Sequence, residues 1–403
     1  MEFGPILRAM TRNKTGAILI ALQIAFTMTI MINAIHIIEE RNDAMARPSG
    51  LDEANLFYLT STGFADDFNE QQQIEEDLRQ IRALSGVVNA VQINAIPLSG
   101  GGWSMGLSTE PGADADGTGV AVYFVDEHGI DTFGVEQVAG ENFDITDVGW
   151  RERTDTEWPD KTILTVAMAT EMFPDDPMSA VGKTVYINDT EPMTVIGLIK
   201  TLQAPWNGWS GVERSMLVPQ KMLFGSARYL IRTEPGARDT LMPQVEEMLA
   251  ASNRGRIIRS MRSLEETRER SYRGDRSMTL MLKIVVGILT AVTALGIVGL
   301  ASFAVNRRTR QIGTRRALGA SKGDIMRYFL VENFMITTMG VVLGAIMTVI
   351  FNIMLVDSLS LPPLNVWYIP AAVLVMWAVG FLAVSGPARR ASNVPPAVAT
   401  RTA

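Results

Sequence analysis

Long charge-free apolar runs and one long polar segment make up the hydrophobic pattern of this chain. The first run, residues 16–38, has no charged side chain before Glu39, and three more follow at 284–305, 334–356 and 367–386. Each run has roughly the 20 residues that a helix needs to cross a bilayer. The pattern therefore predicts four membrane-spanning helices. With their flanking residues we assign them to 16–38, 277–305, 331–356 and 367–386.

A cleavable signal peptide is the alternative interpretation of the first run. Such a peptide has a shorter apolar core, and small residues follow it at the cleavage site. In this chain Glu39, Glu40 and Arg41 follow the apolar run directly. The sequence therefore favours a span that is retained.

The segment between the first two spans, residues 39–276, is too long for a connecting loop and predicts a folded domain. Runs of β-branched and aromatic residues predict strands, and apolar residues at a period of 3.6 predict helices. Asn188 and Asp189 are expected to turn a hairpin, and the Gly-, Ser- and Asp-rich residues 100–118 to form an exposed loop. The expected strands are 55–60, 86–96, 120–125, 162–166, 184–187, 193–199 and 227–233, and the expected helices are 69–84 and 240–252. The predicted fold class is an α-helical membrane protein with four spans and a large mixed α/β domain.

Charge is unevenly divided along the chain. Residues 39–276 carry 22 Lys and Arg against 39 Asp and Glu, a net of −17, whereas the other residues carry 14 against 4, a net of +10. The positive residues flank the spans, and short flanks rich in Lys and Arg stay in the cytoplasm. We therefore expect 1–15, 306–330 and 387–403 to be cytoplasmic. The domain 39–276 and the short loop 357–366 are expected on the other side.

The composition excludes several chemistries. The chain has no cysteine, which rules out disulfides and thiolate metal sites, and no metal-ligand spacing surrounds His36 or His128. The Gly-Lys-Thr at 182–184 resembles the end of a phosphate-binding loop, but Pro177 stands where that loop needs its first glycine. No nucleophile, base and acid stand out as a set. We expect no catalytic residue, no metal and no cofactor on this chain, and no nucleic-acid partner.

A polar stripe lies on the first span. Thr29, Asn33 and His36 recur at i, i+4 and i+7, which places them on one helix face. A polar stripe in hydrocarbon faces protein or water, so it predicts a contact with another helix or with a second transmembrane subunit. The alternative is that His36 lies at the membrane interface and Asn33 is an isolated polar residue.

Small residues recur at a spacing of four in two of the predicted spans. Gly287 and Ala291 form one pair, and Gly340 and Gly344 form the other. This spacing permits close helix packing. Because it is common in membrane helices, we expect ordinary packing within the subunit.

The basic segment 306–334 has structural features beyond its seven Lys and Arg residues. Gly319 is expected to end a short helix, because glycine adopts the left-handed backbone that ends many helices. Ser321, with Asp324 three residues later, is expected to cap the next helix. A structured basic helix between two spans predicts a docking element for a partner.

This segment also resembles a known family. The pattern RTRQIGTRRALGASKGDI at 308–325 is similar to the signature of FtsX/MacB-like permeases, the membrane subunits of type VII ABC transporters. Residues 7–25, 181–200 and 387–401 resemble the family as well. The resemblance implies a porter-like lobe that carries an inserted lobe near 100–220, and a coupling helix against an ATPase subunit. The residues on or beside that helix would be Arg315, Arg316, Ala317, Leu318, Gly319 and Ala320.

The resemblance implies a permease subunit of the bacterial inner membrane. It would work with an ABC ATPase dimer and a second permease, either the same chain or a homologue. Because few residues precede the first span, we expect the ATPase, with its ATP and Mg, on a separate polypeptide. ATP-driven movement of the outer domain, or mechanotransmission, would serve export or efflux of a periplasmic substrate, with a periplasmic adaptor and an outer-membrane channel as further partners. Lipoprotein release and a transmembrane signalling or activator role remain alternatives.

Overall fold

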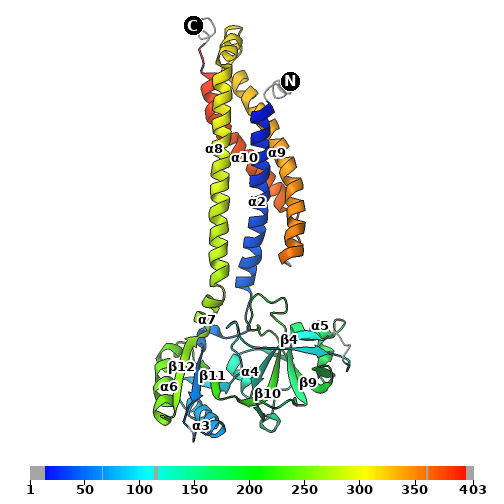
Figure 1. The fold of residues 1–403 in the computed structure, drawn as a ribbon, viewed down its shortest axis with the longest axis vertical. Helices are drawn as coiled ribbons and strands as arrows, with labels where there is room; N and C mark the ends of the chain where they lie inside the picture. The colour runs from blue at the N-terminus through cyan, green and yellow to red at the C-terminus, as the bar shows by residue number, and fades with distance from the viewer. Residues whose placement is uncertain (1–13, 66, 113–116, 360–361, 396–403) are drawn as a thin grey trace. The chain divides into compact units, whose positions relative to one another are not determined.

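The computed structural model describes residues 14–65, 67–112, 117–359 and 362–395. These residues divide into two compact units. The chain up to Met45 and from Asp275 onward forms a helical unit, and Ala46–Gly274 forms an α/β unit (Figure 1). Most of the predicted N-terminal segment 1–15 and the end of the tail 387–403 lie outside the described residues.

The helical unit has four helices that are long and apolar enough to cross a membrane. The first three contain their apolar runs and extend beyond both ends, and the fourth begins one residue after the start of its run and extends beyond its end (Figure 1). The helices are α2 (Lys14–Ala46), α8 (Arg273–Ala317), α9 (Lys322–Leu359) and α10 (Tyr368–Ser392).

The prediction of a separate short helix in the basic segment is wrong. The helix α8 continues without a break through the arginines to Ala317. Residues 306–317 contain no proline, and their single glycine, Gly313, is buried in the helix. One glycine costs a helix only about 1 kcal/mol, which the rest of a long helix readily offsets.

Small residues bring α9 close to α2. A Cβ added at Gly344 would lie 3.1 Å from Cα of Ala25, and one added at Gly340 would lie 2.8 Å from the carbonyl oxygen of Ala21. The predicted packing role of these two glycines is confirmed. Gly287 differs, because a Cβ there would have nothing within 4 Å.

A leucine at position 344 is expected to destabilise the helical unit. Overpacking of a close contact costs about 1–3 kcal/mol, because either α2 or α9 must move. Thermal unfolding of the detergent-solubilised Gly344→Leu variant measures the effect. Gly287→Leu is the matched control and should leave the unfolding temperature nearly unchanged. Equal losses in the two variants would contradict the assigned contact.

The first sheet of the α/β unit is antiparallel and has four strands. Helices α3 (Glu70–Arg82) and α6 (Arg238–Ser252) pack on one face, where their apolar residues meet Phe57 and Leu59. Leu56 and Tyr58 point to the other face and join a core shared with the second sheet. Residues 56–59 belong to one strand of this sheet. Because that strand is buried on both faces, its side chains are continuously apolar rather than alternating between apolar and polar. The strands, in spatial order, are β12 (Arg256–Ser263), β1 (Leu56–Gly63), β11 (Ser226–Thr233) and β2 (Val87–Gln92).

The second sheet closes on itself, because β10 pairs with both β7 and β4. Its interior is packed with apolar side chains such as Val122, Leu164, Val195 and Met216. The strand order is β4 (Thr118–Val125), β3 (Trp103–Ser108), β8 (Thr184–Ile187), β9 (Glu191–Ile199), β7 (Lys161–Thr165), β10 (Ser215–Leu223) and β6 (Gly149–Glu152), with β5 (Gln137–Gly140) beside β9. The short helices of the α/β unit are α4 (Gly129–Phe133), α5 (Val166–Met172) and α7 (Leu264–Ser271), with 3₁₀ turns at Glu53–Asn55, Ile145–Asp147 and Pro177–Ala180.

The second sheet is an insertion in the first. The chain leaves the first sheet after β2, forms strands β3 to β10, and returns at β11. The predicted inserted lobe is therefore confirmed. The predicted hairpin is also confirmed: Ile187 pairs with Glu191, and Asn188 and Asp189 both have positive φ, at +49° and +65°.

The expectation of an exposed loop over 100–118 is partly wrong. Strand β3 lies inside it, while residues 113–116 are outside the described part. The sequence of β3, WSMGLS, has weak strand character, but β4 and β8 pair with it on its two sides. Backbone hydrogen bonding from two neighbours therefore outweighs the local preference for a loop.

A buried ion pair links the first sheet to its helices. Arg256 of β12 and Asp77 of α3 form a salt bridge in which both side chains are fully buried. The hydroxyl of Tyr229 in β11 also donates to Asp77, at 2.7 Å. Burial, together with the charge of Asp77, raises the pKa of Tyr229 well above its usual value, so the hydroxyl remains a donor.

Candidate functional site

The turn between α8 and α9 is the centre of the candidate site. Gly319 has φ of +98°, a backbone conformation that favours glycine. The Ala320 N–H donates to the Arg315 carbonyl at 3.0 Å, and the Gly319 N–H donates to the Arg316 carbonyl at 3.2 Å. This is the Schellman pattern that ends many helices. The sequence correctly predicts the end of the helix at Gly319.

The start of α9 is fixed by a reciprocal cap. The Ser321 hydroxyl accepts from the Asp324 N–H at 3.1 Å, and the Asp324 carboxylate accepts from the Ser321 N–H at 2.9 Å. Two backbone donors that the helix itself cannot satisfy are thereby bonded. The predicted cap is confirmed, and with Gly319 it makes the turn rigid.

The turn is anchored to the bundle by an apolar cluster. Ile312 of α8, Phe329 of α9 and Ala388 of α10 are buried together beneath it. The guanidinium of Arg315 also lies over the ring of Tyr328, 5.1 Å from its centroid. Contacts with α9 and α10 hold the end of α8 in place.

The residues expected to couple to an ATPase divide into exposed and structural ones. Leu318 is 85% exposed and is the most exposed large apolar side chain of the described residues. Arg315, Ala317 and Gly319 are exposed as well. Arg316 is half-buried, and its Nη1 donates to the carbonyl of Ala320 at 2.9 Å. Leu318 is therefore free to contact a partner, whereas Arg316 also holds the turn together.

The polar stripe of α2 forms the first of the two expected contacts, a contact with another helix, and that helix belongs to the same chain. Thr29 donates to the carbonyl of Gly344 at 3.3 Å, and Asn33 accepts from Asn352 at 3.4 Å, both on α9. The Nε2 of His36 lies 3.0 Å from a backbone carbonyl oxygen between α9 and α10. None of the three is more than 6% exposed. The stripe packs within the chain, because polar groups in an apolar bundle need nearby partners.

The structure contains an ion pair between α8 and α9 that was not predicted from the sequence. Nη1 of Arg308 lies 2.8 Å from Oε2 and 3.0 Å from Oε1 of Glu332. Glu332 is only 9% exposed. A carboxylate inside a predicted membrane span is rare and costly unless it is paired. The presence of Glu332 in the predicted span 331–356 was therefore the sequence signal for an ion pair.

The Gly-Lys-Thr segment does not form a phosphate-binding loop. Thr184 begins strand β8, whereas a phosphate-binding loop leads into a helix whose N-terminus holds the phosphates. Lys183 instead lies over the ring of Phe173, with Nζ 4.4 Å from the centroid. Among the described residues, no group of three His, Cys, Asp or Glu side chains is placed to hold a metal ion.

Four apolar helices, an α/β domain between the first and second, and a basic turn between the second and third are the arrangement that the resemblance to ABC-transporter permeases implied. Two families match this chain. The FtsX-like permease C-terminal family matches residues 283–396, and the MacB-like periplasmic core domain matches residues 15–248. The chain therefore belongs to the FtsX/MacB family of permeases.

Curated relatives and solved structures are similar to parts of the chain. The macrolide export ATP-binding/permease protein MacB of Chromobacterium violaceum is 25% identical over 65% of this chain and 40% of its own length. The ABC transporter permease YknZ of Bacillus subtilis is 28% identical over 59% of this chain and 61% of its own length. The match thus spans less than two thirds of either relative. The periplasmic region of MacB from Actinobacillus actinomycetemcomitans aligns over 55% of this chain and 93% of that structure, with 13% identity and a TM-score of 0.34.

Proposed function

We propose that this chain is the permease subunit of an ABC complex for export. A separate ATPase dimer would bind at the α8–α9 turn in the cytoplasm of a bacterium, and the α/β unit would lie in the periplasm. The movement that follows ATP binding would pass through the bundle to the α/β unit. The chain itself would bind no nucleotide, which agrees with the strand that follows its Gly-Lys-Thr segment.

The observation that carries the proposal is the rigid turn on an unbroken helix. A helix of 45 residues is about 67 Å long at roughly 1.5 Å per residue. It joins the exposed Leu318 directly to the chain segment that enters the α/β unit. A force applied at one end of a continuous helix reaches the other end, because its backbone hydrogen bonds resist bending.

A pair of permeases, identical or homologous, fits the surface of α8. This helix carries exposed apolar residues along its length, and its most apolar 18-residue stretch is only 11% buried within the chain. In a membrane such a surface faces lipid or another helix. We propose that part of it contacts the second permease, and that the substrate is handled outside the membrane.

Co-purification with partner proteins tests this function. The tagged full-length chain is extracted in mild detergent, its partners are identified by mass spectrometry, and ATP hydrolysis is measured on the same sample. We expect an ATPase with a phosphate-binding loop, a second permease and hydrolytic activity. The same sample reveals any periplasmic adaptor or outer-membrane channel. A kinase or cell-wall hydrolase without an ATPase would instead favour the signalling or activator role.

A further inference from the structure

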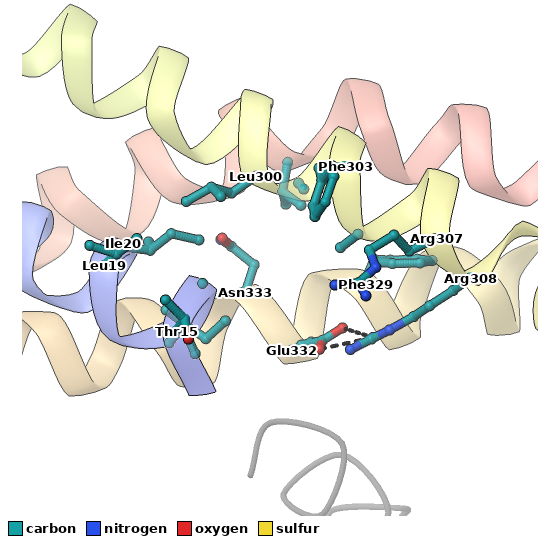
Figure 2. Close-up of a pocket in the computed structure, with 16 residues that line it drawn as sticks. Thr15, Leu19, Ile20, Leu300, Phe303, Arg307, Arg308, Phe329, Glu332 and Asn333 are labelled. Carbon is teal, nitrogen blue, oxygen red and sulfur yellow. Dashed lines mark hydrogen bonds and ion pairs between the residues drawn. The ribbon is translucent and has the colours of Figure 1, made fainter. Parts of the chain in front are cut away.

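A cavity of about 360 Å³ lies in the helical unit, at the end that carries the α8–α9 turn. It is formed by α2, α8 and α9, with Val384 contributed by α10. Figure 2 shows the side chains that surround it. Its size falls within the roughly 300–1,000 Å³ of small-molecule sites. Residues 315–320 of the α8–α9 turn lie outside its lining.

The lining of the cavity is apolar at one end and charged at the other. Leu19, Ile20 and Leu300 lie on one side, where Thr15 and Asn333 are the neighbouring uncharged polar side chains (Figure 2). Arg307, the Arg308–Glu332 pair and Phe329 lie on the opposite side (Figure 2). A ligand that fits both ends has an apolar tail and a polar head.

The charged end has an excess of positive charge. Arg308 and Glu332 neutralise each other through their two hydrogen bonds. Arg307 is exposed, and its guanidinium lies 5.5 Å from the centroid of the Phe303 ring. It forms no ion pair with any residue that the structure describes. Arg307 is therefore the cation that remains for an anionic group.

We propose that this cavity binds one anionic phospholipid, with an acyl chain in its apolar end and the phosphate against Arg307. Arg307 directly follows the charge-free residues 284–306 of α8, which places its guanidinium at the level of the lipid headgroups. The adjacent leaflet supplies a molecule with the required tail and head. Since lipid tails are already in an apolar environment, the acyl chain gains little by entering, and the headgroup decides which lipid binds.

Lipid retention by the full-length chain tests the site without any ATPase, so its outcome is independent of the proposed function. The chain is equilibrated in mixed micelles with equal amounts of phosphatidylglycerol and phosphatidylcholine, and bound lipid is counted by native mass spectrometry. One arginine near an anionic headgroup is worth about a fivefold preference. We expect that preference in the wild type and its loss in Arg307→Gln.

Two further variants separate the cavity from general surface charge. Arg310→Gln removes an exposed arginine of the same helix that does not line the cavity, and it should keep the preference. Ala304→Leu adds bulk inside the lining and should reduce retention of both lipids. Equal retention of the two lipids by the wild type, or equal losses in the two arginine variants, would overturn the proposal.

Other occupants give distinct results. Displacement of the bound lipid by millimolar inorganic phosphate would indicate a site for a soluble anion. Lipid binding that appears only after residues 1–13 are deleted would assign the cavity to the chain's own N-terminal segment. Each of these results would replace the phospholipid as the ligand.

Discussion

Replacing Leu318 with aspartate is expected to weaken association with the proposed ATPase subunit about 30-fold or more. A central apolar side chain of an interface contributes roughly 2 kcal/mol or more when removed, and a buried unpaired carboxylate adds to the loss. Leu318 is 85% exposed in the chain itself, so the substitution should leave the fold intact. Pull-down of the ATPase from membranes, with quantification by mass spectrometry, measures the change.

Control variants make the Leu318 result specific. Leu318→Met retains an apolar side chain and should bind nearly as the wild type does. Asn393→Asp adds the same charge at an exposed position just after α10 and should also bind normally. Arg316→Glu is a poorer probe, because Arg316 also bonds the carbonyl of Ala320 within the turn. Undiminished binding by Leu318→Asp would rule out the turn as the docking site.

Replacing Arg256 with methionine is expected to destabilise the first sheet by about 3–5 kcal/mol. The substitution leaves Asp77 fully buried without its cationic partner, and an uncompensated buried charge is costly. Hydrogen exchange of amides in β1, β11 and β12 of the full-length chain should accelerate on the order of 10²–10⁴-fold. The amides of the helical unit should exchange at their normal rates.

The exposed pair Arg270–Glu266 provides the matched control. Its side chains are 46% and 43% exposed and are spaced i, i+4 on α7. Because surface pairs of this kind contribute only about 0.3–0.5 kcal/mol, Arg270→Met should change exchange very little. Equal acceleration in the two methionine variants would mean that the buried pair has no special role.

The sequence predicts those strands that are marked by a continuous run of apolar side chains. Runs such as residues 56–59 and 120–125 are continuously apolar and buried, and the structure has strands there. Strand β10 was missed because Pro219 argues against a central strand, although parallel pairing with β4 includes it. Strand β12 was missed because its arginines and serines resemble a surface segment.

The turn of the candidate site was predictable from local chemistry. The helix end at Gly319 and the Ser321–Asp324 cap are formed by residues within a few positions of each other. Such short-range hydrogen bonds do not depend on how the rest of the chain folds. The pairing of Arg308 with Glu332 joins residues 24 positions apart. Only the packing of α8 against α9 brings those two side chains together.

The sequence by itself determined the four apolar helices and the helix end and cap at the α8–α9 turn. These features follow from local hydrophobic length, backbone preference and short-range hydrogen bonds. The tertiary structure alone decided that the stripe of Thr29, Asn33 and His36 faces its own chain, that Leu318 is exposed while Arg316 is half-buried, and that a cavity opens beside Arg307. Those outcomes depend on which helix faces lie against each other, and packing among distant residues selects those faces.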